Sequence, residues 1–382
     1  MSELKITVKR LEIPLKESFK HASADRSVGE SLWVVAKLGA HSGFGEGCPR
    51  VYVTGEELGP SIEWAETMAI ALMLKSPKNL SELQSFMLAN DAEISKHPAA
   101  WCALELALLD VYAKAQGCSL ESLLGVSEEK HLFRYTAVLS ADEPKRFGER
   151  IARYAKYGFT DFKLKVMGDA AVDYPRLRAF GERFGAIKNY WPLSRSLFPL
   201  FYDLRLRLDG NNAWKGRESE LDAFLKNIPF KPWAIEEPFA AFDLANMHRL
   251  IKNHGVSVIL DESLRGIGDI TSLDAYPGAW IPNLRVSKLG GLLKSLEVLR
   301  AAQARGLSVI VGAQVGESSV LSRAALVLAR AAGKSLVAQE GAFGEMLLKE
   351  DPVKPVVQFS VGGFVFHRSH NQVGSGLKGI SV

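Results

Sequence analysis

Three acidic residues stand at the ends of short apolar segments, spaced like the repeats of an alternating strand–helix protein. Asp209, Glu236 and Asp261 follow one another at intervals of 27 and 25 residues. Each interval is about the length of one strand with its following helix. The C-terminal ends of barrel strands open onto one mouth, where catalytic groups lie. The spacing therefore predicts that these three carboxylates meet at one point.

Gathered carboxylates repel one another and raise one another's pKa unless a cation neutralises them. Mg²⁺ prefers carboxylate oxygens and leaves positions for water or substrate, and Mn²⁺ suits the same ligands. We therefore predict a divalent metal, Mg²⁺ or alternatively Mn²⁺, with Asp209, Glu236 and Asp261 as its ligands. A single acidic residue after a strand is more often a helix cap, so the prediction depends on all three together.

Lysines flank the three carboxylates in the sequence. Lys163 and Lys165 end the second predicted strand, and Lys288 follows the sixth, so a barrel would place Lys165 and Lys288 on opposite sides of the metal. A lysine near a metal and a second lysine can have its pKa lowered toward ~7–8 and act as a general base. A metal on a substrate carboxylate stabilises the dianion left when the adjacent carbon loses its proton. This pattern predicts proton abstraction next to a carboxylate.

Other residues are candidates for contact with the substrate or for a place beside the metal. No histidine lies between Gly306 and Ser319, which disfavours chemistry that needs a histidine after the seventh strand. The additional candidates are Lys163, Asn211, Glu237, Glu262, Glu317, Phe19, Arg26 and Tyr52.

The elements that would position these groups are eight short apolar segments separated by amphipathic stretches. Their order predicts a (β/α)₈ barrel or a close relative. A doubly wound sheet is the competing layout, but it would normally show a Gly-rich loop after its first strand, and none is present. The predicted strands are 135–139, 162–166, 204–208, 233–235, 256–260, 280–286, 307–311 and 335–338.

Residues 1–130 have a different pattern and predict an α+β domain that caps the barrel. Segments 6–13 and 32–38 alternate and are predicted strands, whereas 16–30 is polar without a period and is predicted to be a mobile loop. Helices are predicted near 55–75, 80–88 and 98–116. The barrel domain is predicted over 131–350, and 351–382 is expected to return to the capping domain.

Composition excludes several classes of protein. The chain has 382 residues, more than the roughly 250–300 that one core usually serves, so added structure around a barrel is expected. A net charge of +4 without a basic run argues against nucleic acid or a membrane surface as partner. Three cysteines without a C-x-x-C pair fit a reducing cytoplasm. No apolar stretch of about 18 residues exists.

Taken together, these motifs resemble the enolase superfamily, and within it the muconate-lactonizing-enzyme subgroup of the mandelate racemase/muconate lactonizing enzyme family. Gly43-Phe44-Gly45-Glu46 is similar to a turn of the family's capping domain, and Ser122-Leu123-Leu124-Gly125 to the turn after its long helix. The resemblance implies that Lys165 and Lys288 are an acid/base pair.

By the same resemblance, the chain is an isomerase, a racemase or epimerase of a small amino-acid-derived carboxylate. The alternative is a lyase or cycloisomerase similar to o-succinylbenzoate synthase or muconate-lactonizing enzyme. A homo-oligomer is compatible with the sequence.

Two departures from the family pattern are visible. Lys165 and Asp209 are 44 positions apart where about 27 are expected, and the excess falls near 184–203, whose aromatic and proline content indicates a packed excursion. Dipeptide epimerases of the subgroup carry an Asp-x-Asp pair after strand eight that holds the substrate ammonium. Here the stretch reads Gln339-Glu340-Gly341-Ala342-Phe343-Gly344, so a substrate with a free amine is disfavoured, although Glu340 could substitute in part.

Overall fold

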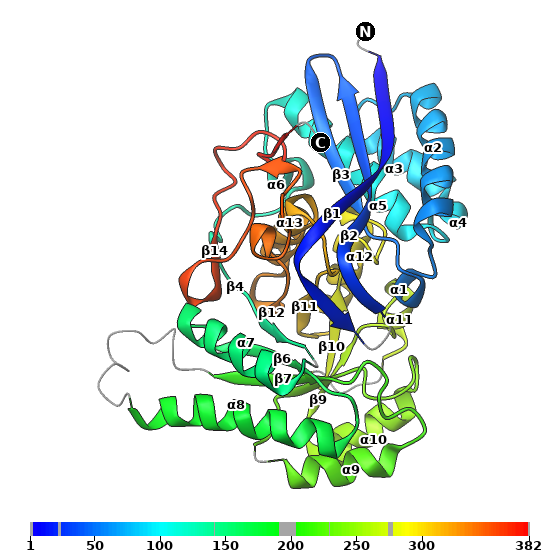
Figure 1. Ribbon diagram of the computed structural model, residues 1–382. Coiled ribbons are helices and arrows are strands. Elements are labelled where there is room, and N and C mark those ends of the chain that lie inside the picture. Colours follow the sequence, from blue (N-terminus) through cyan, green and yellow to red (C-terminus); the bar gives the residue numbers. More distant parts are fainter. Residues whose placement is uncertain are drawn as a thin grey trace.

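A computed structural model describes residues 3–21, 24–140, 142–190, 204–228, 230–273 and 278–380. The side chains of 17–21, 24–26, 185–190 and 345 are not part of that description. Figure 1 shows an upper lobe built from the N-terminal residues, a barrel below it, and the C-terminal segment running along one side of both.

The barrel is an eight-stranded parallel sheet whose strands follow chain order from β5 to β12. A backbone hydrogen bond of 2.7 Å from the Thr136 N–H, directly before β5, to the Gln339 carbonyl of β12 joins the first and last strands. The fold prediction is confirmed, and each of the eight predicted segments coincides with a strand. The strands are β5 (Ala137–Leu139), β6 (Asp161–Lys165), β7 (Arg205–Asp209), β8 (Ala234–Glu236), β9 (Ser257–Leu260), β10 (Trp280–Leu284), β11 (Val309–Val311) and β12 (Leu336–Gln339).

A helix connects each strand of this sheet to the next and covers its outer face (Figure 1). The seven helices are α7 (Pro144–Tyr157), α8 (Ala170–Tyr190), α9 (Glu218–Asn227), α10 (Leu244–His254), α11 (Ile267–Thr271), α12 (Leu292–Ala304) and α13 (Ser319–Ala332). Helix α8 reaches Tyr190, so the extra length before β7 begins as helix. The rest of the predicted excursion, 191–203, lies outside the described residues.

An apolar layer fills the barrel directly below the strand ends. The buried side chains of Ala234, Ile259, Ile281, Ile310 and Ala338 form one cluster. Because side chains two residues apart on a strand share a face, Ala234 and Ile259 lie one step below Glu236 and Asp261. The inward-facing side chains of the barrel therefore change from apolar to acidic at the strand ends, and the acidic side chains lie directly on a packed apolar layer.

The capping lobe is a three-stranded antiparallel sheet of β1 (Leu4–His21), β2 (Ala24–Leu38) and β3 (His41–Gly47). The predicted mobile loop over 16–30 is wrong for the residues described, because β1 and β2 continue as a paired hairpin in which Phe19 lies opposite Arg26. Backbone pairing in a two-stranded ribbon does not require alternating apolar side chains, which is why the polar sequence concealed it.

Two helices of the capping lobe, α2 and α5, pack against this sheet (Figure 1). The helices predicted near 55–75, 80–88 and 98–116 coincide with α2, α3 and α5. The six helices are α1 (Val51–Thr54), α2 (Leu58–Lys75), α3 (Leu80–Ala89), α4 (Asp91–Ile94), α5 (Pro98–Gln116) and α6 (Leu120–Leu124).

The glycines of Gly43-Phe44-Gly45-Glu46 lie within strand β3, so the predicted turn is wrong. A Cβ added to Gly43 would stand 2.1 Å from the Ala107 carbonyl, and one added to Gly45 would stand 1.8 Å from the Ala103 carbonyl. Glycine at alternate positions therefore lets the backbone of α5 lie directly on the strand. Phe44 and Glu46 point to the other face of the sheet.

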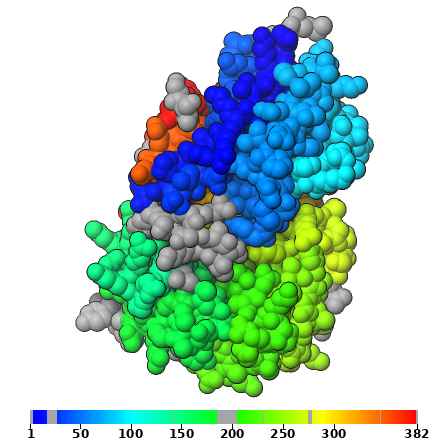
Figure 2. Space-filling model, turned by 45° about the vertical axis from the view of Figure 1, so that its right-hand side comes forward, coloured from blue at the N-terminus to red at the C-terminus, as the bar shows by residue number. Residues whose placement is uncertain are grey.

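The C-terminal segment contacts both lobes, and Figure 2 shows the visible part of it beside the N-terminal strands of the capping lobe. The Ser375 N–H donates to Asp110 Oδ1 of α5 at 2.7 Å, and the Lys114 ammonium donates to the Leu377 carbonyl at 3.3 Å. Strand β14 (Phe364–Phe366) pairs with β4 (Leu132–Arg134), and β13 (Val353–Lys354) pairs with β15 (Lys378–Gly379). Three short 3₁₀ turns complete the described fold, η2 (Gly333–Ser335), η3 (Gly344–Met346) and η4 (Val361–Gly363).

Cys48, Cys102 and Cys118 are free thiols. Within the described part of the chain, no helix combines the length and the apolar character needed to cross a membrane.

Candidate active site

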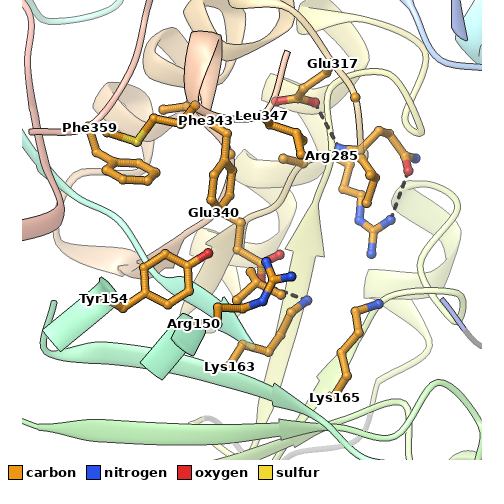
Figure 3. Close-up of a pocket in the computed structure, with 18 of the residues that line it drawn as sticks. Arg150, Tyr154, Lys163, Lys165, Arg285, Glu317, Glu340, Phe343, Leu347 and Phe359 are labelled. Atoms are coloured by element: carbon orange, nitrogen blue, oxygen red, sulfur yellow. Dashed lines mark hydrogen bonds and ion pairs between the residues drawn. The ribbon is translucent and has the colours of Figure 1, made fainter. Parts of the chain in front are cut away.

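A cavity of about 320 Å³ opens at the C-terminal ends of the barrel strands. Lys163, Lys165, Asn211 and Asp261 line it at one end, and Tyr52 of the capping lobe also reaches it. Figure 3 shows the lysines rising from the barrel floor toward the arginine and glutamate side chains above them. The strand-end residues selected from the sequence are therefore brought together by the barrel, as their spacing predicted.

Lys163 lies at the centre of a buried group of carboxylates. Its Nζ is 3.2 Å from Asp209 Oδ2, 3.2 Å from Glu236 Oε2 and 3.0 Å from Glu340 Oε1. Burial disfavours the charged ammonium, but the three carboxylates outweigh burial and raise the pKa of Lys163. This lysine is thus held protonated and does not resemble a base.

Lys165, two residues along the same strand, is in a different environment. Its Nζ is 3.7 Å from Asp209 Oδ2 and donates to Asn211 Oδ1 at 3.3 Å. Burial is the largest influence on Lys165 and lowers its pKa. The backbone and side-chain amides of Asn211 also donate to Asp209 Oδ1, and these hydrogen bonds orient the Asp209 carboxylate. Asn211 has a φ of 43°, an unusual backbone conformation for a residue other than glycine.

On the opposite side of the barrel, the third carboxylate is bound by two cations. Arg285 contacts Asp261 Oδ2 and lies 3.9 Å from Glu236 Oε1. Lys288 donates to Asp261 Oδ1 at 3.0 Å, to the Asp261 carbonyl at 2.6 Å and to the Asn283 carbonyl at 3.0 Å. Arg285 lines the cavity, whereas Lys288 is absent from the described lining.

The sequence placed Lys288 opposite Lys165, but among the described lining residues Arg285 and not Lys288 reaches the cavity from this side; the acid/base role of Lys288 stays a prediction. Strand β10 ends at Leu284, so residue 285 is the first past the strand end. Lys288 lies in the following turn, behind Asp261, where all three of its ammonium hydrogens have carbonyl or carboxylate acceptors. The rule that selected Asp209 and Asp261, namely to take the residue at the strand end, would have found Arg285.

Several other groups of the site were not selected from the sequence. Arg207 of β7 is fully buried and bonds Glu340, and Asn283 of β10 donates to Glu236 Oε1 at 3.0 Å. Both side chains point inward from strand positions with the same alternation as the predicted residues. Period-two alternation on β7 and β10 is the signal that could have indicated them.

The remaining candidates occupy different places. Glu262 and Glu317 line the cavity, and burial raises the pKa of each to about 8. Glu237 is outside the described lining, and it accepts from the Asp261 N–H at 2.8 Å and the Ser263 N–H at 2.6 Å, so it shapes the loop after β9. The side chains of Phe19 and Arg26 lie outside the described residues.

The three predicted metal ligands are carboxylates, the oxygen donors that a divalent cation such as Mg²⁺ prefers. Asp209 and Glu236 share the Lys163 ammonium, and Glu236 and Asp261 share the Arg285 guanidinium, so positive charge already bridges the carboxylates. Burial, with the neighbouring carboxylates adding to it, raises the pKa of Glu236 to about 8, which indicates that more positive charge would be accommodated there. In the arrangement described, these cations separate the carboxylates, and among the described residues no three acidic, histidine or cysteine side chains form a ready ligand set.

Comparison with known proteins identifies relatives along the whole chain. The family described as enolase C-terminal domain-like matches residues 146–377, and the mandelate racemase / muconate lactonizing enzyme N-terminal domain matches residues 5–125. An L-Ala-D/L-Glu epimerase of Clostridium acetobutylicum is 26% identical over 385 residues, 98% of each chain. An N-succinyl-L-Arg/Lys racemase of Bacillus cereus is 27% identical over 283 residues, 74% of this chain and 71% of the racemase.

Solved structures agree on the fold. A dipeptide epimerase from Enterococcus faecalis V583, crystallised with Mg and the dipeptide L-Leu-L-Tyr, superposes with a TM-score of 0.80 at 24% identity. The match covers 98% of this chain and 99% of that one.

Proposed function

The chain belongs to the enolase superfamily, within the mandelate racemase/muconate lactonizing enzyme family, and on that premise we propose that it is a metal-dependent racemase or epimerase of an amino-acid derivative. The reaction would begin with removal of the proton next to a substrate carboxylate. One observation carries the proposal: an amine of lowered pKa, Lys165, opens on the same cavity as a group of carboxylates drawn from adjacent strands. The naming of the curated relatives as epimerases and racemases supports it.

In this proposal Asp209, Glu236 and Asp261 hold Mg²⁺, or Mn²⁺ in its place. When bound, the metal would supply positive charge that stabilises the dianion formed by proton loss. The Mg in the crystals of the E. faecalis neighbour supports the choice of metal. Lys163, fixed between carboxylates, would keep the negative charge of the site balanced.

Lys165 would take the proton from one face of the substrate. The barrel has eight strands, so β10 lies across from β6, and Arg285 lies across from Lys165. Figure 3 shows the Lys165 side chain extending toward the Arg285 guanidinium. Arginine does not give up its proton in proteins, so it would serve there as a permanent cation beside the developing dianion.

An isomerase also needs a group that returns a proton to the second face. Glu262 follows Asp261 on the Arg285 side of the cavity, and its Oε2 is buried without a hydrogen-bond partner. A neutral carboxyl group can donate a proton to the carbanion. We therefore assign this role to Glu262 within the proposal.

A second candidate, β-elimination or cycloisomerisation, is favoured by Arg285 itself. A site with one amine and a fixed cation suits a reaction in which Lys165 alone moves a proton and the dianion then expels or captures a group. Lyase chemistry would leave Glu262 without a catalytic role.

The test is to incubate N-acyl amino acids with the enzyme and Mg²⁺ in ²H₂O, following α-deuterium by NMR and configuration by chiral chromatography. The unaltered enzyme is expected to exchange the α-proton and to invert the configuration, and excess EDTA should abolish both. Glu262→Gln is expected to lose inversion and to keep exchange. Exchange with a new product of altered mass would favour the second candidate. Absence of exchange for every carboxylate tested would refute proton abstraction altogether.

A further inference from the structure

The end of the cavity away from Lys165 and Arg285 is lined by aromatic rings. Tyr154 and Tyr157 come from helix α7, Phe343 follows β12, and Phe359 belongs to the C-terminal segment. Figure 3 places Tyr154, Phe343 and Phe359 together on one side of the cavity, and Lys165 with Arg285 on the other. We call these four residues the aromatic wall.

The aromatic wall is a packed surface. The Phe359 ring lies edge to face with Phe343 at 5.1 Å between centroids, with Tyr157 at 6.3 Å and with Phe159 behind them at 4.8 Å. The Phe359 N–H donates to the Ala342 carbonyl at 3.1 Å, which ties the C-terminal segment to the turn after β12. Rings held in this way offer a preformed apolar surface that a ligand can cover at little entropic cost.

The charged groups beside the aromatic wall are cations. Helix α7 brings Arg150 and Arg153 to the cavity together with its two tyrosines. Arg150 also bonds Asp142 at 2.7 Å, an interaction that holds the guanidinium at this position. An ammonium group on a ligand would be repelled here, whereas a neutral or anionic group would not.

The carboxylates among the described lining residues follow strands β9, β11 and β12 and are Asp261, Glu262, Glu317 and Glu340. Glu262 follows Asp261 and interacts electrostatically with Arg285. Asp261 is paired with Arg285 and Lys288, and Glu340 is paired with Lys163 and Arg207. Glu317 accepts the Gln314 N–H at 2.9 Å. Glu340 is therefore committed to internal cations and is not available for a substrate ammonium.

We propose that the aromatic wall is the subsite for the far end of the substrate, and that the substrate is an N-acylated amino acid whose acyl group ends in an aryl or similarly apolar group without positive charge. This inference rests on the proposed function, because it concerns the substrate of the same cavity. The reacting carboxylate would lie toward Lys165 and Arg285, and the acyl end would cover Phe343, Phe359 and the α7 tyrosines.

A matched pair of ligands tests the inference directly. N-(3-phenylpropanoyl)-L-alanine and the dipeptide L-Phe-L-Ala carry the same phenyl group and differ by one ammonium group, on the carbon next to the acyl carbonyl. Dissociation constants measured by calorimetry with Mg²⁺ present are expected to favour the acyl compound by roughly tenfold or more, because the ammonium would lose water without gaining a carboxylate. Equal affinity, or tighter binding of the dipeptide, would overturn the inference.

Two variants connect the selectivity to the wall. Phe343→Ala is expected to weaken N-(3-phenylpropanoyl)-L-alanine by roughly tenfold and N-acetyl-L-alanine, which lacks the aryl group, by less than about twofold. Arg153→Glu, at an exposed position of α7, is expected to reduce the ratio by which N-(3-phenylpropanoyl)-L-alanine binds more tightly than L-Phe-L-Ala. Equal weakening of both acyl compounds by Phe343→Ala would also overturn the inference.

The outcomes separate this inference from the proposed function. If N-acetyl-L-alanine exchanges its α-proton but the aryl group brings no gain in affinity, the aromatic wall is not the subsite and proton abstraction stands. If the aryl preference is found and no carboxylate exchanges, the subsite stands and the proposed reaction is wrong.

Discussion

Lys163 and Lys165 lie two residues apart on one strand, yet their surroundings move their pKa values in opposite directions. Three carboxylates surround Lys163 and raise its pKa, whereas burial lowers the pKa of Lys165. When the surroundings move the pKa values of two neighbouring groups apart, the direction of each shift indicates which group can act as an acid and which as a base. At neutral pH the group better suited to accept a proton is Lys165.

Lys165→Ala is expected to slow α-deuterium exchange by roughly 10²–10⁴-fold, the usual contribution of a positioned base, with ligand affinity retained. In the unaltered enzyme the exchange rate should fall as pH falls through the lowered pKa of Lys165, since the protonated amine cannot accept a proton. Exchange measured by NMR across a pH series checks both points. A variant that exchanges at the original rate would remove Lys165 from the proposed chemistry.

Arg285→Lys tests whether an amine opposite Lys165, on the second face of the substrate, would increase inversion. A lysine there could return a proton, so the ratio of inversion to exchange is expected to rise by roughly an order of magnitude, provided that the lysine is protonated when the carbanion forms. Chiral chromatography and NMR on the same samples give the ratio. Because Arg285 also contacts Asp261, Mg²⁺ affinity should be measured in parallel as a control. An unchanged ratio would mean that a lysine at position 285 returns no proton beyond those that Glu262, the proposed donor, already supplies.

At the scale of elements, the hairpin of β1 and β2 is attached to the barrel on both of its strands. The Lys16 N–H donates to the Leu347 carbonyl at 2.8 Å, and the Lys349 N–H donates to the Pro14 carbonyl at 2.9 Å. On the other strand, Gly29 packs against Gly316, which lines the cavity. The hairpin therefore reaches the mouth of the barrel and is held beside it.

Gly29→Ala is expected to displace this hairpin. The added Cβ would stand 2.9 Å from the Gly316 carbonyl oxygen, closer than real Cβ contacts allow. We expect KM to rise by roughly three- to tenfold through lost positioning, and the free energy of unfolding to fall by about 1–3 kcal/mol, the usual cost of overpacking. Gly59→Ala is the matched control, because a Cβ at Gly59 would meet nothing within 4 Å. Equal kinetics in both variants would mean that the hairpin does not contribute to binding.

At the scale of the whole molecule, buried acidic groups join the capping lobe, the barrel and the C-terminal segment. Glu46 of β3 accepts from the Ser318 N–H at 3.0 Å and from Ser318 Oγ at 2.6 Å. Asp351 of the C-terminal segment accepts from Ser319 in the same way. The start of α13 is thus held from two sides by carboxylates belonging to other parts of the chain.

Glu46 makes stability depend on pH. Burial raises the pKa of Glu46 from its ordinary value of 4.5 to about 7 in the folded protein, so the folded state binds more protons between these pH values. Stability should therefore fall as pH rises through this window, by up to roughly 3 kcal/mol from Glu46 alone. Glu46→Gln removes the ionisation and should flatten the dependence of Tm on pH between about 5 and about 8. The control is Glu63→Gln, at an exposed site on α2. If Glu46→Gln and the unaltered protein show the same slope, this prediction is wrong.

The sequence by itself determined the barrel and the convergence of Asp209, Glu236, Asp261, Lys163 and Lys165. These follow from strand periodicity, from the length of one strand–helix unit and from the rule that parallel strands end at one mouth. All three are local or nearly local properties, so they can be recognised in a single amino-acid sequence. The metal and the acid/base roles assigned to these residues remain predictions.

Only the tertiary structure decided which cation faces Lys165, how the segment 16–30 is paired, and what lies at the far end of the cavity. Arg285 directly follows the last residue of β10, whereas Lys288 lies three residues further along, in the turn behind Asp261. Glu340 is bound by Lys163 and Arg207 from strands more than 130 positions earlier in the chain. Contacts of this kind depend on how distant segments pack, and no pattern along the chain records them.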